Sequence, residues 1–130
     1  MNNKIKKLGD AELEIMMVLW SSTQPVTSGY ILEQLKEKRS WALSTLMTSL
    51  ARLSDKEFIF CDRATRSNLY SAIITENEYK AQESKSFLAK LYGNSLQSLV
   101  TNLYSNKVID QADLKELQEY LKDLEEENKV

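Results

Sequence analysis

The sequence predicts a mainly α-helical chain in two parts, in which a two-stranded β-hairpin separates three helices from three more. Three observations support this prediction. Apolar residues recur with the period of a helix over residues 43–56. A pattern typical of strands follows over residues 58–73, and helical periods then return. We therefore expect two domains, one over residues 1–74 and one over residues 75–130.

The composition excludes several classes of protein. With 130 residues, of which 42% are apolar, the chain has enough apolar side chains for one small domain with an appendage. It has no run of 18 apolar residues, so we expect no membrane span or membrane partner. The first residues lack the apolar stretch of a secretory signal, which favours the cytoplasm.

Histidine is missing from the sequence, and Cys61 is the sole cysteine. These two facts exclude histidine-based catalysis, histidine metal sites and a thiolate cluster within one chain. We therefore expect no metal, no cofactor and no enzymatic activity. A small enzyme is the least supported of the alternatives, because the acidic residues form no evident catalytic pair.

The first two helices are predicted from their capping residues and apolar spacing. Asp10 is expected to cap the first helix, because its side chain can accept a backbone N–H. The inward stripe of that helix is expected to be Leu13, Met16, Met17 and Trp20. A turn over residues 21–25 holds the sole proline, and Thr27 is expected to cap the second helix. Its inward residues are expected to be Tyr30, Ile31 and Leu35, with Leu32 as a further candidate.

The helix over residues 43–56 carries the strongest functional signal. Its four leucines are expected on one buried face: Leu43, Leu46, Leu50 and Leu53. The opposite face holds small or hydroxylated residues and the single cation Arg52, without an acid, which favours contact with a polyanion. We interpret this helix as a DNA-recognition helix, with a merely solvated face as the alternative. Its predicted DNA contacts are Ser44, Thr45, Met47, Thr48 and Arg52.

Two short strands follow this helix, over residues 58–61 and 68–73. The polar tip between them carries Arg63 and Arg66, which we expect to contact DNA phosphates. Three helices followed by a two-stranded hairpin is the order of a winged helix-turn-helix. In that arrangement the third helix enters the major groove and the hairpin, or wing, follows the DNA backbone.

The charge differs between the two parts of the chain. Residues 1–72 hold ten Lys and Arg against eight Asp and Glu, whereas residues 73–130 hold seven against eleven. The basic start, with Lys4, Lys6 and Lys7, is expected to add salt-sensitive contacts to the DNA backbone. The positive charge of the first part is small, so a winged helix that binds another protein instead of DNA stays open as an alternative.

The second part is predicted to be a three-helix dimerisation domain. Thr75 with Glu78 has the spacing of a capping box, and Asp110 is expected to cap the last helix. Short helices with apolar stripes need a surface to cover them, and a second copy of the chain provides one. Packing within one chain is the alternative. The residues predicted at the dimer interface are Phe87, Leu91, Leu96, Leu99, Val100, Leu103, Leu114, Leu117 and Leu121.

Several of these segments resemble the BlaI/MecI/CopY family of penicillinase repressors. The opening over residues 8–16, followed by Trp20, is similar to the start of that family, and Trp41 with residues 44–53 resembles its recognition helix. Further matches are Arg66 and Tyr70 in the hairpin and residues 85–88 and 100–103 in the second part. The resemblance implies a winged helix, a helical dimerisation domain closer to the BlaI/MecI branch, and a homodimer that represses an operon by binding double-stranded, pseudo-palindromic operator DNA.

The resemblance also implies a mode of release. In the β-lactam branch, a sensor-linked protease is associated with cutting of the repressor at an Asn-Phe bond, and the matching pair here is Asn102 and Leu103. The copper branch uses a cysteine-rich motif near its C-terminus, which this sequence lacks.

Three departures from the family bear on DNA contact. Met47 stands where the family often has Gln, and it offers an apolar contact, for example to a thymine methyl group. The usual glycines after the recognition helix and at the hairpin tip are Glu57 and Thr65 here. We therefore expect a different operator sequence or weaker binding, and a different shape of the hairpin turn.

Overall fold

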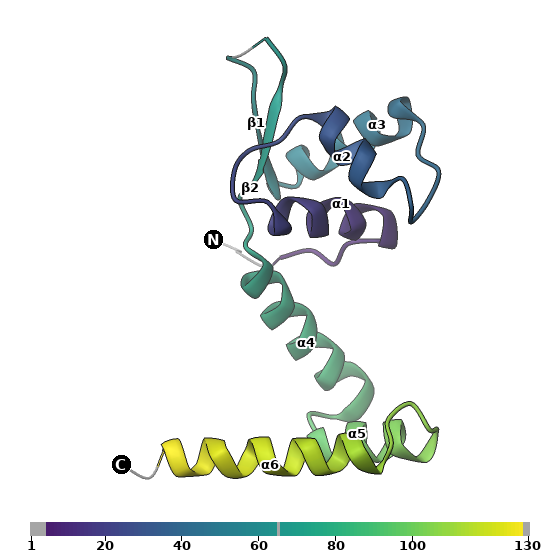
Figure 1. Cartoon of the computed structure of the whole chain (residues 1–130), viewed down its shortest axis with the longest axis vertical. Coiled ribbons are helices and arrows are strands. Elements are labelled where there is room, and N and C mark those ends of the chain that lie inside the picture. The colour runs from purple at the N-terminus through teal and green to yellow at the C-terminus, as the bar shows by residue number, and fades with distance from the viewer. Residues whose placement is uncertain (1–4, 65, 129–130) are drawn as a thin grey trace. The chain divides into compact units, whose positions relative to one another are not determined.

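The computed structural model describes residues 5–64 and 66–128, and over these residues it contains six helices and one two-stranded antiparallel sheet (Figure 1). The elements in chain order are α1 (Asp10–Ser21), α2 (Ser28–Leu35), α3 (Leu43–Asp55), β1 (Ile59–Asp62), β2 (Leu69–Ala72), α4 (Glu76–Tyr92), α5 (Leu96–Ser105) and α6 (Gln111–Glu127). The predicted order of a mainly α-helical chain with one hairpin is confirmed. The chain divides into two compact units, which meet between Ser84 and Lys85.

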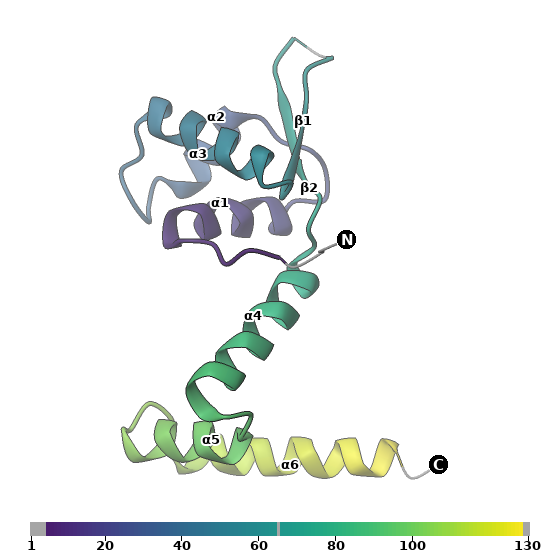
Figure 2. The same ribbon diagram turned by 180° about the vertical axis from the view of Figure 1, so that it is seen from behind.

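The first unit has a continuous hydrophobic core. Helices α1, α2 and α3 cluster together, and the hairpin of β1 and β2 lies beside them and projects beyond them (Figures 1 and 2). Each of these five elements contributes to the core, as do residues before and after them. The buried apolar residues are Leu8, Ile15, Met16, Leu19, Ile31, Leu35, Leu46, Leu50, Leu53, Phe58, Ile59, Tyr70 and Tyr79.

Helix α1 differs from the prediction at its start and in its buried face. Its N-cap is Gly9, whereas Asp10 is the first helical residue, where a carboxylate still interacts favourably with the helix dipole. Met17 was expected inside but is exposed, and the buried positions belong to Ile15 and Leu19. The buried face is therefore rotated relative to the predicted stripe.

Helix α2 begins as predicted. The Thr27 hydroxyl oxygen accepts a hydrogen bond from the backbone N–H of Tyr30 at 3.1 Å, which satisfies one of the free donors at the helix start. The prediction that Tyr30 points inward is wrong, because its side chain is exposed. Ile31 and Leu35 are buried; their spacing of four residues places both on one face, and Tyr30 lies beside that face.

The hairpin pairs Ile59 with Ala72 and Asp62 with Leu69 in antiparallel register. The first strand is shifted by one residue from its predicted range, and the second is one residue shorter at each end. On the other side of β2, the backbone groups of Val26 and Tyr70 exchange two hydrogen bonds of 3.0 and 2.7 Å. The loop between α1 and α2 is therefore tied to the outer edge of β2.

The first turns of α4 belong to the first unit. Thr75 and Glu78 form the predicted capping box, with reciprocal hydrogen bonds of 2.9 and 3.1 Å. One turn later, the Tyr79 hydroxyl accepts a hydrogen bond from the backbone N–H of Leu8 at 2.9 Å. Its ring packs against the rings of Trp20 and Phe58. The unit boundary therefore lies at Ser84 rather than after residue 74, because α4 supplies a core side chain before it leaves the first unit.

The second unit consists of the end of α4 with α5 and α6. Helix α4 ends at Gly93 and Asn94, whose φ angles of 54° and 67° are left-handed, the usual way to terminate a helix. Asp110 caps α6 as predicted and forms a capping box with Asp113. None of the described residues from 85 to 128 is fully buried within the single chain. Of the helices in the described part of the chain, none is long and apolar enough to cross a membrane.

Candidate nucleic-acid interface

Helix α3 has a buried face and an outward face. Leu46, Leu50 and Leu53 are buried as predicted. The prediction for Leu43 is wrong, because this side chain is 53% exposed. Leu43 is the first residue of the helix and lies beyond the edge of the core, and Ser49 takes part in the buried face instead. The predicted DNA-contacting residues of α3 are all exposed: Ser44, Thr45, Met47, Thr48 and Arg52.

The outward face of α3 has two chemically different edges. At about 100° per residue, Leu43 and Met47 fall on one edge and Thr45 and Arg52 fall on the other. The middle of the face holds small or hydroxylated side chains, namely Ser44, Thr48 and Ala51. The apolar edge and the polar edge are thus separated by a strip on which a neighbouring molecule can approach the helix closely.

The acid-free character of this face ends with the last residue of the helix. Asp55 is exposed and lies on the outward side, which the prediction for the face did not include. The first three turns, from Leu43 to Arg52, carry one cation and no acid. The part of α3 suited to a polyanion is therefore its N-terminal part.

Hydrogen bonds on α3 limit what its side chains can offer. The Thr48 hydroxyl donates to the backbone carbonyl of Ser44 at 3.0 Å, so its proton is already used within the helix. Thr48 is exposed, and its hydroxyl oxygen can still accept a hydrogen bond. Ser44 is not the cap of α3, since the N-cap is Ala42 and makes no side-chain hydrogen bond. The first backbone N–H groups of α3 therefore lack a side-chain cap, and such groups are suitable donors to a phosphate.

A salt bridge holds the C-terminal end of α3 against α1. The Lys56 ammonium, at the C-cap of α3, lies 2.9 and 3.1 Å from the two carboxylate oxygens of Glu12. Both side chains are largely shielded, with 30% of Lys56 and 13% of Glu12 exposed. Shielding from solvent strengthens such a pair relative to a surface pair. The contact fixes the end of α3 to the first helix.

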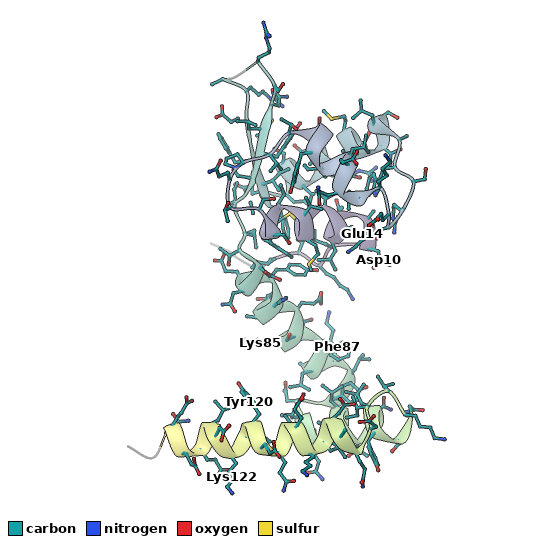
Figure 3. The ribbon with its side chains drawn as sticks, viewed as in Figure 1. Asp10, Glu14, Lys85, Phe87, Tyr120 and Lys122 are labelled. Atoms are coloured by element: carbon teal, nitrogen blue, oxygen red, sulfur yellow. The ribbon has the colours of Figure 1, made fainter. Side chains whose placement is uncertain are left out.

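A second salt bridge from α1 holds the segment just before α3. The Arg39 guanidinium donates to the Glu14 carboxylate at 2.9 Å, and its central carbon lies 5.9 Å from the centre of the Trp41 ring. Figure 3 shows Glu14 on α1. Trp41 stands out in the sequence by its resemblance to the family, whereas the four charged residues of the two bridges were not predicted as a set. The available signal was the pair of acids in the opening segment that resembles the repressor family.

The hairpin presents its two arginines at the tip. Arg63 and Arg66 are exposed and lie in the turn between β1 and β2. The hairpin extends beyond the helices (Figure 1). The Asp62 carboxylate accepts a hydrogen bond from the backbone N–H of Ala64 at 2.9 Å, which shapes the turn. Thr65, between them, lies outside the described residues. Of the N-terminal lysines, Lys6 and Lys7 are exposed and Lys4 also lies outside the described residues.

Glu57 keeps the backbone conformation for which a glycine is best suited. Its φ angle is 64°, in the left-handed region, directly after α3. A residue with a Cβ atom pays about 1–2 kcal/mol to adopt this conformation. The turn from α3 into the hairpin is therefore maintained without a glycine.

Burial perturbs two tyrosines of the first unit. Burial raises the pKa of Tyr70, which lies opposite Cys61 in the hairpin, and the neighbouring Cys61 adds to the increase. Burial likewise raises the pKa of Tyr79, against which the hydrogen bond from Leu8 acts. No group of three or more acidic or cysteine side chains with metal-binding geometry occurs within the described residues.

The residues predicted at the dimer interface lie in the second unit, all of them partly or largely exposed. Phe87, Leu91, Leu96, Leu117 and Leu121 are exposed, and Leu99, Val100, Leu103 and Leu114 are half-buried. Further exposed apolar side chains of this unit, not among those predicted at the interface, are Tyr104, Val108 and Tyr120. Tyr120 and Lys122 leave α6 on opposite sides (Figure 3). Asn102 is exposed on α5, and its side-chain oxygen accepts a hydrogen bond from the Tyr92 hydroxyl at 3.3 Å.

The sequence profile of the penicillinase repressor family matches residues 8–123. This chain belongs to the penicillinase repressor family. It is 30% identical over 120 residues to the penicillinase repressor of Bacillus licheniformis, covering 92% of this chain and 93% of that protein. It is 29% identical over 121 residues to the methicillin resistance regulatory protein MecI of Mammaliicoccus sciuri, covering 93% and 98%. The members of this family are repressors, which are not enzymes.

Two solved structures match the winged-helix part of this family member. The DNA-binding domain of the repressor BlaI superimposes with a TM-score of 0.51 at 29% identity, covering 60% of this chain and 94% of that one. Monomeric BlaI of Bacillus licheniformis in complex with the blaP half-operator gives 0.50 at 30% identity, covering 58% and 92%. The predicted winged helix-turn-helix is therefore confirmed.

Proposed function

We propose that this chain is a homodimeric transcriptional repressor that binds a pseudo-palindromic operator through α3 and the hairpin. The observation that carries the proposal is the outward face of α3, which is rich in hydroxyls and free of acids as far as Arg52. It occurs on a fold shared with a BlaI structure that contains a half-operator. In helix-turn-helix proteins the N-terminal residues of the recognition helix contact base edges, and the acid-free turns of α3 are its N-terminal ones.

Each edge of the face has a proposed role. Arg52 and Thr45 contact bases or nearby phosphates from the polar edge, and Thr48 accepts a hydrogen bond from a base or makes an apolar contact through its methyl group. Ser44 and the uncapped backbone N–H groups of the first turn hold a phosphate. Met47 lies at the other edge and contributes an apolar contact to a base.

The wing and the N-terminal lysines supply contacts that do not depend on sequence. Arg63 and Arg66 are exposed at the hairpin tip, where a guanidinium can donate two hydrogen bonds to one phosphate. Lys6 and Lys7 add charge. These contacts displace counterions from the DNA, so the affinity falls as the salt concentration rises.

The proposed dimer forms through the second unit. Its helices have large exposed side chains, including Leu91, Leu96 and Leu121, and no fully buried residue among those described. Apolar surface of this extent usually marks a protein interface. A two-fold symmetric pair covers the same patch on both copies, and it presents two α3 helices to two half-sites.

Release of the operator is proposed to follow proteolysis between Asn102 and Leu103 by a sensor-linked protease, or another inducer signal. Both residues lie within α5, and Leu103 is half-buried. A protease needs an extended segment, so α5 must unwind locally before cleavage. Mass spectrometry of the repressor from induced and uninduced cells tests this step, and an intact chain under all inducing conditions rejects proteolysis.

The central test is a fluorescence anisotropy titration with the promoter of the chain's own operon and with a scrambled fragment. We expect a preference for the promoter, and Arg52→Ala is expected to reduce it. The double variant Arg63→Ala and Arg66→Ala should weaken binding to both fragments equally and lower the salt slope by about four, because each subunit of the dimer loses two phosphate contacts. Equal affinity for both fragments, together with salt-insensitive binding to a protein, would instead establish the protein-interaction module.

A further inference from the structure

We propose that the apolar edge of α3, formed by Leu43 and Met47, reads the C5 methyl groups of thymines in the operator. The inference rests on the proposed function and names what one edge of the recognition helix recognises. It assigns to Leu43 a role in sequence specificity, in place of a role in the core.

The exposure of these two side chains separates them from every other large apolar residue of α3. Leu43 is 53% exposed and Met47 is 38% exposed, whereas the remaining leucines of the helix are at most 1% exposed. They are four residues apart, so they are neighbours on one edge of the outward face. Both lie in the first two turns, the part of a recognition helix that reaches base edges.

The chemistry of this edge matches one base. In the major groove all four bases present hydrogen-bonding groups, but thymine alone also presents a methyl group, at C5. Leu43 has no polar side-chain atom, and the Met47 thioether is at most a weak acceptor. In the strip of small and hydroxylated residues beside this edge, Thr48 offers no additional hydrogen-bond donor. Its hydroxyl already donates to the backbone carbonyl of Ser44 at 3.0 Å.

The opposite edge gives the reading a direction. Thr45 and Arg52 carry hydrogen-bond donors, so a half-site with a thymine on one side and an acceptor-rich base or a phosphate on the other fits α3 in one orientation only. A helix with two polar edges would lack this constraint. Leu43 and Met47 therefore help to select the half-site sequence and also the orientation in which the half-site is bound.

The test replaces thymine by deoxyuridine, which removes the C5 methyl group and keeps the base-pairing edge. After the operator is mapped by footprinting of the full chain on its own promoter, each thymine in the footprint is replaced in turn and the affinity is measured by anisotropy. We expect at least one replacement to weaken binding by the wild-type chain about four-fold, the effect of burying one methyl-sized group.

Three variants decide between direct reading and an effect on DNA shape. The double variant Leu43→Ala and Met47→Ala should bind the thymine and deoxyuridine operators with equal affinity. Met47→Gln should retain only part of the wild-type difference in affinity between the two operators. Arg52→Ala, on the polar edge, should bind both operators more weakly but keep the full wild-type difference in affinity between them. Both replaced side chains are exposed, and a thermal melt followed by circular dichroism verifies that each variant is folded.

Two results would overturn the inference. Either the wild-type chain is insensitive to every deoxyuridine replacement, or the double variant retains the same sensitivity, in which case the methyl groups act through the DNA alone. A wild-type chain that prefers its promoter but shows no thymine effect contradicts this inference and leaves the proposed function standing. A chain with no promoter preference at all contradicts both.

Discussion

The two units of this repressor distribute their apolar residues in opposite ways. In the first unit, thirteen apolar side chains are buried in one core to which all three helices and both strands contribute. In the second unit, none of the described residues from 85 to 128 is fully buried, and leucines, tyrosines and a phenylalanine lie on the surface of the single chain. Similar helical periods in the sequence thus lead to two different outcomes.

The difference indicates where each unit obtains its stability. A buried core of this kind stabilises the first unit within one chain, because its apolar surface is already removed from water. The second unit gains the same stabilisation only when another surface covers its helices. We therefore expect the stability of the second unit to depend on protein concentration and that of the first unit to be independent of it.

The largest expected effect is on the core of the first unit. Leu50→Ala should lower the free energy of unfolding by about 2–5 kcal/mol, because it leaves a cavity in the core of the first unit. Leu96→Ala is the matched change in the second unit, where the side chain is exposed. In dilute solution it should change unfolding by less than about 0.5 kcal/mol. Urea denaturation at low protein concentration measures both, and equal losses would contradict the comparison.

The second prediction concerns the apolar surface of the second unit. The double variant Leu117→Asp and Leu121→Asp should abolish the dimer and weaken operator binding by about 100-fold or more, since two linked half-site contacts become one. Lys115→Gln with Lys122→Gln lowers the charge by the same amount and serves as the control. Sedimentation equilibrium and anisotropy provide the readouts. A dimer that survives the aspartates, or fails equally in the control, would place the interface elsewhere.

The third prediction concerns the salt bridges that hold α3. A double-mutant cycle of Glu12→Gln and Lys56→Met should give a coupling energy of about 1 kcal/mol, because this pair is shielded. The exposed pair of Glu33 and Lys36, separated by 4.0 Å, is the control and should give close to zero. Either charge reversal alone, Glu12→Lys or Lys56→Glu, should reduce the preference for the operator. The variant that carries both reversals restores an opposite-charge pair and should recover part of that preference. No coupling in either pair would mean that packing alone positions α3.

The smallest expected effect is the response of the first unit to alkaline pH. Burial raises the pKa of Tyr79 above its unfolded value of about 10. Its contribution to stability is therefore complete below pH 10 and is lost as the pH rises through the folded pKa. Tyr79→Phe should lower the free energy of unfolding at pH 8, because the hydrogen bond from the backbone of Leu8 is lost. Above pH 10 the free energy of unfolding should fall less steeply with pH in the variant than in the wild-type chain. Urea titrations of the wild-type chain and the variant at pH 8 and above pH 10 measure both effects.

Local rules predicted much of the fold correctly. The caps at Thr27, Thr75 and Asp110 were predictable because each depends on residues three positions apart. Rotation of a helix about its axis depends on distant partners, and for this reason Met17 and Tyr30 were placed inside although they are exposed. The boundary after residue 74 missed Tyr79, whose hydrogen-bond partner Leu8 is 71 residues away in the chain.

The candidate interface was predictable in part. The exposed hydroxyls and Arg52 followed from helical periodicity, which is a local property. The Glu12–Lys56 and Glu14–Arg39 pairs were missed, because each joins residues 44 and 25 positions apart, respectively. Which carboxylate meets which cation depends on the packing of α1 beside α3, and charge patterns along the sequence do not contain that information.

The two salt bridges from α1 also determine how many mobile ions this protein can release from DNA. Arg39 and Lys56 are already paired with carboxylates, so neither arrives at the phosphates as a free positive charge. Each phosphate neutralised on duplex DNA contributes about 0.9 to the slope of log affinity against log salt. The slope therefore reflects the arginines and lysines of the wing, α3 and the N-terminal segment that form no salt bridge among the described residues, such as Arg52, Arg63 and Lys6. The paired cations contribute rigidity instead of salt dependence.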